Sequence, residues 1–290
     1  MSAAAAPAVV DSHLHVWDLA GGGYGWLTPD LGALHASFGP EAAEQELLGA
    51  RVDGAVLVQA DDTEADTEAM LEAASHHEWV LGVVGWVDLT RPDVARQQLD
   101  RWQHHSAFCG VRHLVHNDPR RDLLDSPAVR SSLHLLAGRG LTFDVPDAWP
   151  AHLRQVRDLA AAVPALRVVL DHLGKPPADR AALPAWRAAV AQVAALPNTV
   201  AKVAGLQHLH RGRPGSASVQ EVFQTALELF GPARLMVGSD WPMTIPWGGY
   251  APSWRITRDL VAELHPDEQG RLLSGTAVDV YGLRSRVTDV

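Results

Sequence analysis

The chain has 290 residues, of which 47% are hydrophobic and 20% are charged, so it can bury a sizeable core without disulfides. Its 24 Lys and Arg residues against 34 Asp and Glu residues give a formal net charge of −10, which argues against nucleic acid or an anionic membrane as the main partner. Cys109 is the only cysteine, which excludes an internal disulfide.

The first residues, MSAAAAPA, carry no basic segment and no long apolar core, so we interpret residues 1–8 as a flexible tail rather than a signal peptide. No apolar run approaches the roughly 18 residues that a membrane span needs. Together with the single cysteine, these features predict a protein of the cytoplasm.

Eight short apolar runs follow, separated by longer segments with helical periodicity. The predicted strands are Ala8–Asp11, Gly54–Gln59, Leu81–Val87, Cys109–Leu114, Leu141–Val145, Arg167–Leu170, Thr199–Val203 and Arg234–Val237. The predicted helices include Thr63–His76, Pro92–Trp102, Pro127–Ala137, Trp149–Ala162, Trp186–Ala195 and Val219–Phe230. For the helix at Pro127, Ser126 is the expected N-cap and Gly138 or Gly140 the expected end. We expect His208–Ser218 to be a mobile loop.

The fold class follows from the composition of these strands. They are almost continuous runs of Val, Ile and Leu, which is typical of a parallel sheet buried on both faces. Eight of them with helices between favour a (β/α)8 barrel over a doubly wound sheet, because the turn after the first strand lacks the glycines of a phosphate-binding turn. No repeat or linker divides the chain, so we expect one domain over residues 1–290.

Two histidines, His13 and His15, stand one residue apart just after the first predicted strand. Residues i and i+2 of a strand point to the same face, so both imidazoles would aim at one point; the alternative is a solvated strand end. Polar side chains also follow the other seven runs, at the end of the barrel where catalytic groups lie. They include Gln59, Asp88, Arg112, Asp144, His172, Lys202 and Asp240.

From these residues we assign the chemistry to His13, His15, His172 and Asp240. Three imidazoles and one carboxylate can bind a divalent metal ion. They can equally polarise a carbonyl group directly while the carboxylate takes a proton from water. For His172 and Asp240 the structural alternative is that they cap the end of a strand or a short helix.

Five further residues are candidates for substrate binding: Trp26, Gln59, Arg112, Lys175 and Lys202. Arg112, Lys175 and Lys202 would donate hydrogen bonds to a ligand, and the alternative for each of these cations is a structural ion pair. For Lys202 that alternative is a salt bridge inside the mouth of the barrel. Trp26 would form an apolar wall, and Gln59 would help to orient the ligand.

Several motifs, taken in order, resemble a known group. They are DSHLHVWD, YGWL, VLVQA, GVVGWVDL, GVRHLVHNDP, VVLDHLGKP, VAKVAGL, VGSDWPM and LLSGTAVDVYGL, which together run from about Val10 to Leu283. The sequence resembles the lactonase branch of the amidohydrolase superfamily, which includes sugar-lactone hydrolases of the fuconolactonase and rhamnonolactonase type and the related 2-pyrone-4,6-dicarboxylate lactonases. The resemblance implies a distorted (β/α)8 barrel of the metal-dependent-hydrolase type that opens the lactone ring of a small sugar.

The resemblance also assigns roles to individual residues. His13 and His15 match the first-strand pair of the family, His172 the sixth-strand histidine and Asp240 the eighth-strand aspartate, while Arg112 matches an arginine that holds substrate. The fifth strand, LTFDVPD, has no histidine, which argues against a centre of two metals. We therefore expect either one divalent ion, zinc, held by these four residues, or catalysis without a metal.

The alternatives differ in chemistry. The related pyrone-dicarboxylate hydrolases surround their substrate with several arginines, whereas here the sixth-strand motif carries Lys175 and the seventh strand carries Lys202. Lysine lacks the forked geometry that binds carboxylates, so a neutral lactone suits this sequence better than a dicarboxylate. A metal-dependent decarboxylase of the same superfamily is the second alternative. A catalytically silent barrel that binds sugar acids or a partner protein is the third.

Overall fold

The computed structural model describes residues 9–209 and 216–283. The predicted tail over residues 1–8 and the middle of the predicted loop His208–Ser218 lie outside these described residues. Among the helices that are described, none is both long enough and apolar enough to cross a membrane.

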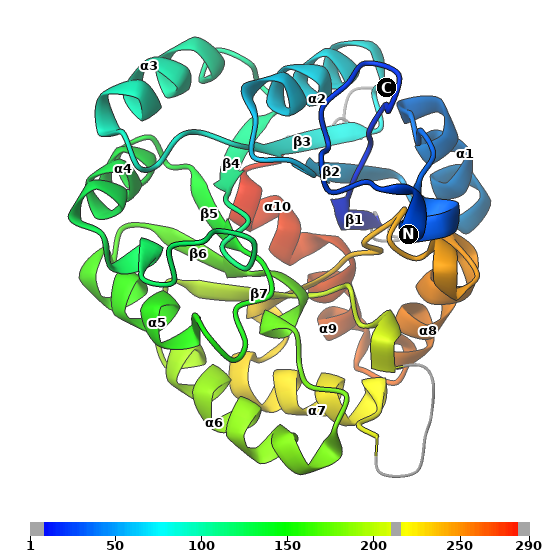
Figure 1. The fold of residues 1–290 in the computed structure, drawn as a ribbon. Helices are drawn as coiled ribbons and strands as arrows, with labels where there is room; N and C mark the ends of the chain where they lie inside the picture. Colours follow the sequence, from blue (N-terminus) through cyan, green and yellow to red (C-terminus); the bar gives the residue numbers. More distant parts are fainter. Residues whose placement is uncertain (1–8, 210–215, 284–290) are drawn as a thin grey trace, which may run out of the picture.

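Eight parallel strands form a ring with their helices on the outside, which confirms the predicted (β/α)8 barrel (Figure 1). In sheet order the strands are β1 (Val10–Leu14), β2 (Gly54–Val58), β3 (Val80–Gly85), β4 (Phe108–Arg112), β5 (Thr142–Val145), β6 (Arg167–Leu170), β7 (Thr199–Val203) and β8 (Leu235–Val237). The pairing register shifts between β1 and β2, between β2 and β3, and between β3 and β4. The barrel is therefore irregular on this side.

The ring closes between β1 and the segment that follows β8. The Asp240 amide donates to the His13 carbonyl over 2.8 Å, and the His15 amide donates to the Trp241 carbonyl over 2.8 Å. These bonds bring the two edges of the eight-stranded sheet together. They also place Asp240 beside the twin histidines, which lie more than 220 positions away in the sequence.

The main helices lie outside the ring. They are α1 (Pro40–Ala50), α2 (Glu64–His76), α3 (Pro92–Trp102), α4 (Pro127–Gly138), α5 (Leu153–Ala162), α6 (Leu183–Ala194), α7 (Val219–Phe230) and α8 (Tyr250–Ala262). Ser126 stands at the N-cap of α4 and Pro127 begins that helix, as predicted. Helix α5 begins at Leu153 rather than at the predicted Trp149, because Pro150 disfavours helical geometry at the residue before it.

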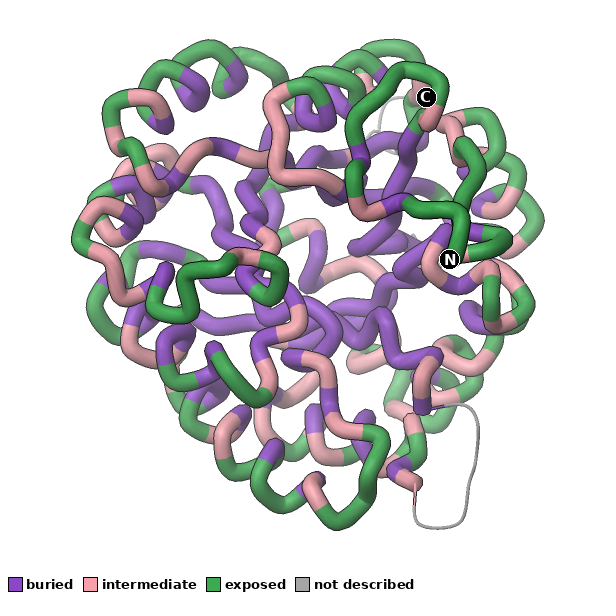
Figure 2. The backbone as a smooth tube through the Cα atoms, viewed as in Figure 1, coloured by how far each residue is buried: buried purple, intermediate pink, exposed green. Residues whose placement is uncertain are grey.

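The C-terminal helix α10 (Thr276–Tyr281) follows the short α9 (Pro266–Gly270) and lies across the far end of the ring (Figure 1). Ala277, Val280 and Tyr281 belong to one buried cluster with side chains from β1, β2, β3, β4, β6, β7 and β8. The barrel interior is thus a buried core, closed at one end by α10, as the buried tube at its centre shows (Figure 2). Among the described residues, the opposite end of the barrel is not covered by a helix in this way.

Inside this core lies a group of charged side chains. Lys202 has no exposed surface, and its Nζ donates to Asp144 Oδ2 over 2.8 Å and lies 3.1 Å from Asp171 Oδ1. The Tyr281 hydroxyl donates to the same Asp144 oxygen over 2.6 Å. Helix α10 is therefore linked to the charged interior by a hydrogen bond as well as by apolar packing.

We predict that Tyr281→Phe lowers the free energy of unfolding by about 1–3 kcal/mol, because a buried hydrogen bond to a charged group is lost. Urea denaturation of the variant and the parent protein measures this difference. Equal midpoints and slopes for the two proteins would show that the hydroxyl contributes nothing to the attachment of α10.

Candidate active site

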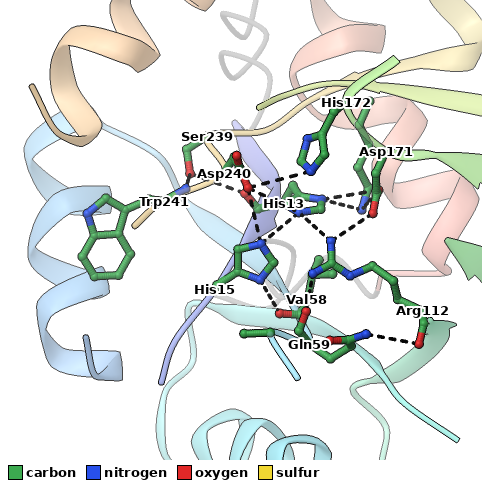
Figure 3. Close-up of polar contacts among 12 residues, drawn as sticks. His13, His15, Val58, Gln59, Arg112, Asp171, His172, Ser239, Asp240 and Trp241 are labelled. Carbon is green, nitrogen blue, oxygen red and sulfur yellow. Dashed lines mark hydrogen bonds and ion pairs between the residues drawn. The ribbon is translucent and has the colours of Figure 1, made fainter. Parts of the chain in front are cut away.

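The twin histidines project from β1 to the same side, as their spacing predicts. His13 and His15 are both buried, and their Nε2 atoms lie 3.1 Å apart (Figure 3). The alternative of a solvated strand end is therefore excluded. The orientation of each ring is set by a contact at its Nδ1 atom. His15 Nδ1 lies 2.7 Å from the Val58 carbonyl oxygen, and His13 Nδ1 lies 3.4 Å from Asp171 Oδ1.

Asp240 and His172 complete a cluster with this pair. Asp240 Oδ1 lies 3.4 Å from His15 Nε2, 3.7 Å from His13 Nε2 and 3.9 Å from His172 Nε2 (Figure 3). Asp240 has a φ of +62° and His172 a φ of +54°, in the left-handed region that non-glycine residues seldom adopt. Gly205 leaves the room for His172, because a Cβ at that position would lie 2.2 Å from its Nδ1. The four residues assigned to the chemistry thus meet at one point.

The hydrogen-bond partners define which ring nitrogens carry lone pairs. A carbonyl oxygen only accepts, so His15 Nδ1 carries the proton toward Val58 and the Nε2 of the neutral ring has a lone pair. His13 Nδ1 lies 3.4 Å from Asp171 Oδ1, an acceptor, and 3.2 Å from Lys202 Nζ, a donor, so this side does not select a tautomer. Arg112 Nη1 lies 3.3 Å from His13 Nε2, and because a guanidinium only donates, this Nε2 has a lone pair. The two Nε2 atoms lie 3.1 Å apart, which is unfavourable for two lone pairs unless a cation or a proton is shared between them.

This geometry fits a metal ion. Two nitrogens that bind one tetrahedral zinc ion with bonds of about 2.0–2.1 Å lie roughly 3.3 Å apart, close to the observed spacing. His13, His15 and Asp240 form one group whose donor atoms lie within 4.8 Å of one another, and His13, Asp171 and His172 form a second. Because Asp171 already accepts from Arg112 and pairs with Lys202, the first group has the freer donor atoms.

Burial and neighbouring charges set the protonation states of the cluster. Burial alone would raise the pKa of Asp240, but the three adjacent histidines, His172 foremost, hold it below its ordinary range. Burial lowers the pKa of both His13 and His172. At neutral pH the cluster therefore contains an anionic carboxylate beside the neutral imidazoles of His13 and His172, and this carboxylate has lone pairs for a proton or a metal ion.

A cavity of about 170 Å³ opens directly above the cluster. It is smaller than the roughly 300–1,000 Å³ of sites for drug-sized ligands and so fits one small ring. Its lining residues are His15, Trp17, Trp26, Ala60, Arg112, Leu114, His116, Asn117, Pro146, Asp147, His172, Lys175, Asp240 and Met243. Three of the five predicted substrate-binding residues, Trp26, Arg112 and Lys175, are among them.

The other two, Gln59 and Lys202, lie below the cavity. Both are fully buried, and neither belongs to its lining. Gln59 donates to Asp62 and to the Arg112 carbonyl, so it ties together the ends of β2 and β4. Lys202 forms the ion pairs inside the barrel, which is the alternative that the sequence left open for it.

From the sequence, His116 and Asp147 are among the polar residues that follow the fourth and fifth predicted strands but have no assigned role, and Asn117 and Met243 are not singled out, although all four line the cavity. They lie on loops after β4, β5 and β8, where no periodicity indicates the direction of a side chain. The one available signal is that each follows a predicted strand by a few residues, on the side where catalytic groups gather.

Fold and site together define a hydrolase-type barrel with a histidine and aspartate centre. The amidohydrolase family model matches residues 10–283, and the chain belongs to this family. It is 31% identical over 276 residues to an L-fucono-1,5-lactonase of Burkholderia ambifaria, with 94% of each chain covered, and 30% identical to one of Burkholderia multivorans, with 94% and 96% covered. An amidohydrolase of Burkholderia multivorans solved with bound zinc superposes with a TM-score of 0.87 at 29% identity, covering 96% of this chain and all of that one.

We predict that the metal-free protein loses stability as the pH falls below about 6.5, the ordinary pKa of histidine. The pKa of His172 is lowered in the folded state, so the unfolded chain binds the extra proton first and acid favours unfolding. Chemical denaturation between pH 7.5 and pH 5 measures this, and His172→Gln should show a shallower dependence. A stability that stays constant or rises on acidification would contradict the assignment of neutral imidazoles.

Proposed function

We propose that the protein hydrolyses the ring ester of a small, uncharged sugar lactone to the open-chain sugar acid. One observation carries the proposal: the Asp240 carboxylate and three imidazoles converge beneath a cavity the size of a single ring. The two curated relatives named as L-fucono-1,5-lactonases support a sugar lactone as the substrate class.

In the mechanism that we propose, Asp240 is the general base. Its carboxylate removes a proton from a water molecule as the water oxygen bonds to the lactone carbonyl carbon. The tetrahedral intermediate collapses by breaking the bond between that carbon and the ring oxygen, and Asp240 returns the proton to the ring oxygen. The products are a carboxylic acid and a free hydroxyl group on one chain.

Negative charge develops on the carbonyl oxygen during this reaction and needs a positive or hydrogen-bonding neighbour. Arg112 lies at the cavity with its guanidinium held by the Gln59 carbonyl and by Asp171, so its direction is fixed before substrate arrives. A zinc ion, when bound, would act as a Lewis acid and lower the pKa of bound water. The residues that would hold it are His13, His15 and Asp240, with His172 beside them.

The charges that line the cavity favour an uncharged substrate over a dicarboxylate. Arg112 and Lys175 are cationic, while Asp147 and Asp240 are anionic, so the formal charges of the lining side chains balance before a metal ion is counted. A site for two carboxylates needs an excess of cations, preferably arginines. This balance counts against a pyrone-dicarboxylate lactonase, the closest alternative by family.

We predict that the protein releases acid from at least one member of a panel of hexono-, pentono- and deoxy-1,5- and 1,4-lactones, followed with a pH indicator. Asp240→Asn should keep the fold and lower kcat by roughly 10²–10⁴-fold, since the general base is lost. Asp267→Asn, an exposed carboxylate on α9, is the matched control and should leave kcat unchanged. No acid release across the panel, or near-normal turnover by Asp240→Asn, would contradict the proposal.

We predict further that the purified protein contains about one zinc ion per chain and that a chelator removes the ion and the activity together. His15→Ala should lower the metal content measured by elemental analysis, because it deletes one of the two facing nitrogens. Full activity in protein that holds no metal would instead favour direct polarisation of the carbonyl by the side chains.

A further inference from the structure

A pair of charged residues at the cavity takes no part in the mechanism above. Asp147 follows β5 and Lys175 follows the turn after β6, and both line the cavity. Their loops are tied together, since the Trp149 amide donates to the Gly174 carbonyl over 2.8 Å. The pair therefore belongs to one rigid part of the wall rather than to two independent loops.

The backbone at both positions is held in an uncommon conformation. Asp147 has a φ of +45° and Lys175 a φ of +64°, in the left-handed region. Residues are kept in such conformations where the surrounding structure over-determines them, and they gather at active sites and ligand contacts. The backbone bond between the loops supplies that constraint here.

The Asp147 carboxylate lacks the partners that a half-buried anion normally has. Its Oδ1 is buried and has no hydrogen-bond partner among the described residues. Its Oδ2 lies 3.8 Å from Lys175 Nζ, which is too far for a hydrogen bond. A hydrogen-bond donor on the ligand would stabilise this carboxylate, because leaving a polar group unpaired costs free energy where water has little access.

We propose that Asp147, with Lys175 beside it, is the specificity-determining pair that recognises an uncharged hydroxyl group of the substrate. The inference rests on the proposed lactone hydrolysis and names the residues that select among lactones. A hydroxyl group can donate to Asp147 and accept from Lys175 at once, so it satisfies both members of the pair. A carboxylate in the same place would gain the lysine but face the repulsion of Asp147.

The test compares kcat/KM for an uncharged lactone, L-fucono-1,5-lactone, with that for D-glucaro-1,4-lactone, which carries a free carboxylate. Asp147→Asn keeps the size of the side chain, and asparagine tolerates the left-handed φ, so the variant should fold. It should lower kcat/KM for the uncharged lactone by roughly 10–100-fold, mainly through KM, because a hydrogen bond to a charged group is weakened. For the charged lactone, kcat/KM should stay the same or rise.

Asp267→Asn again removes one carboxylate without touching the cavity and should change neither value. A purely structural role for Asp147 predicts that Asp147→Asn lowers both values by the same factor. That result, or no change in either value, would overturn the inference.

Binding of an unreactive ring separates this inference from the proposed function. L-Fucose has the hydroxyl groups of a pyranose but no ester, and calorimetry measures its affinity whether or not any lactone is turned over. If no lactone reacts but Asp147→Asn weakens L-fucose binding about tenfold or more, the hydrolysis proposal fails and the role of Asp147 stands. If no lactone reacts and L-fucose binds equally to both proteins, or to neither, the role of Asp147 is refuted as well.

Discussion

The ion pairs of Lys202 inside the barrel are the interaction on which the site depends. Burial alone lowers the pKa of this lysine, but Asp144 and Asp171 raise it above its ordinary value, so the ammonium group stays charged. Asp171 in turn accepts from Arg112 and faces His13 Nδ1. Breaking a buried pair by removing one partner would leave an uncompensated charge, which is strongly destabilising. The position of His13 is therefore determined from within the core.

A second constraint acts from the rim. Asp240 and His172 both have left-handed φ angles. The segment of Asp240 is held by backbone hydrogen bonds to β1, and the lack of a side chain at Gly205 leaves room for the His172 ring. The cluster of His13, His15, His172 and Asp240 is thus positioned by two independent sets of contacts, one below and one beside it. Such preorganisation is what an electrostatic site requires, because its dipoles need not reorient when charge develops. A barrel of the same fold that lacked these contacts would not hold these side chains together, so the fold alone does not determine which reaction is catalysed.

The barrel was predicted well from the sequence. Its strands, such as β6 and β7, are short runs rich in apolar residues, and they alternate with helices of clear periodicity. The sequence also predicted that His13, His15, His172 and Asp240 meet, since parallel strands bring the residues after them to one end. Strand bounds were less accurate: β1 begins and ends later than predicted, at Val10 and Leu14, because its pairing with β2 and with Trp241 carries it past the apolar run.

What the sequence could not determine is depth along the barrel. Lys202 and Gln59 follow the same pattern as the residues that line the cavity, yet their side chains are sealed below it. Only the three-dimensional positions of Asp144 and Asp171 show why a lysine can be buried there. Asp147 follows the fifth predicted strand, but the sequence assigns it no role, since a loop residue at positive φ has no periodic signature. The residues proposed to act on the carbonyl group were thus easier to find than the pair proposed to select the substrate.

On the proposed function, a lactone ring is opened where Asp240 and the three histidines converge. A crystal structure of the protein with the sugar acid product tests it most directly. The new carboxylate of the product should lie beside His15, His172 and Asp240, with a hydroxyl group toward Asp147. A product bound in the cavity with its carboxylate pointing away from this cluster, or bound elsewhere on the protein, would contradict it.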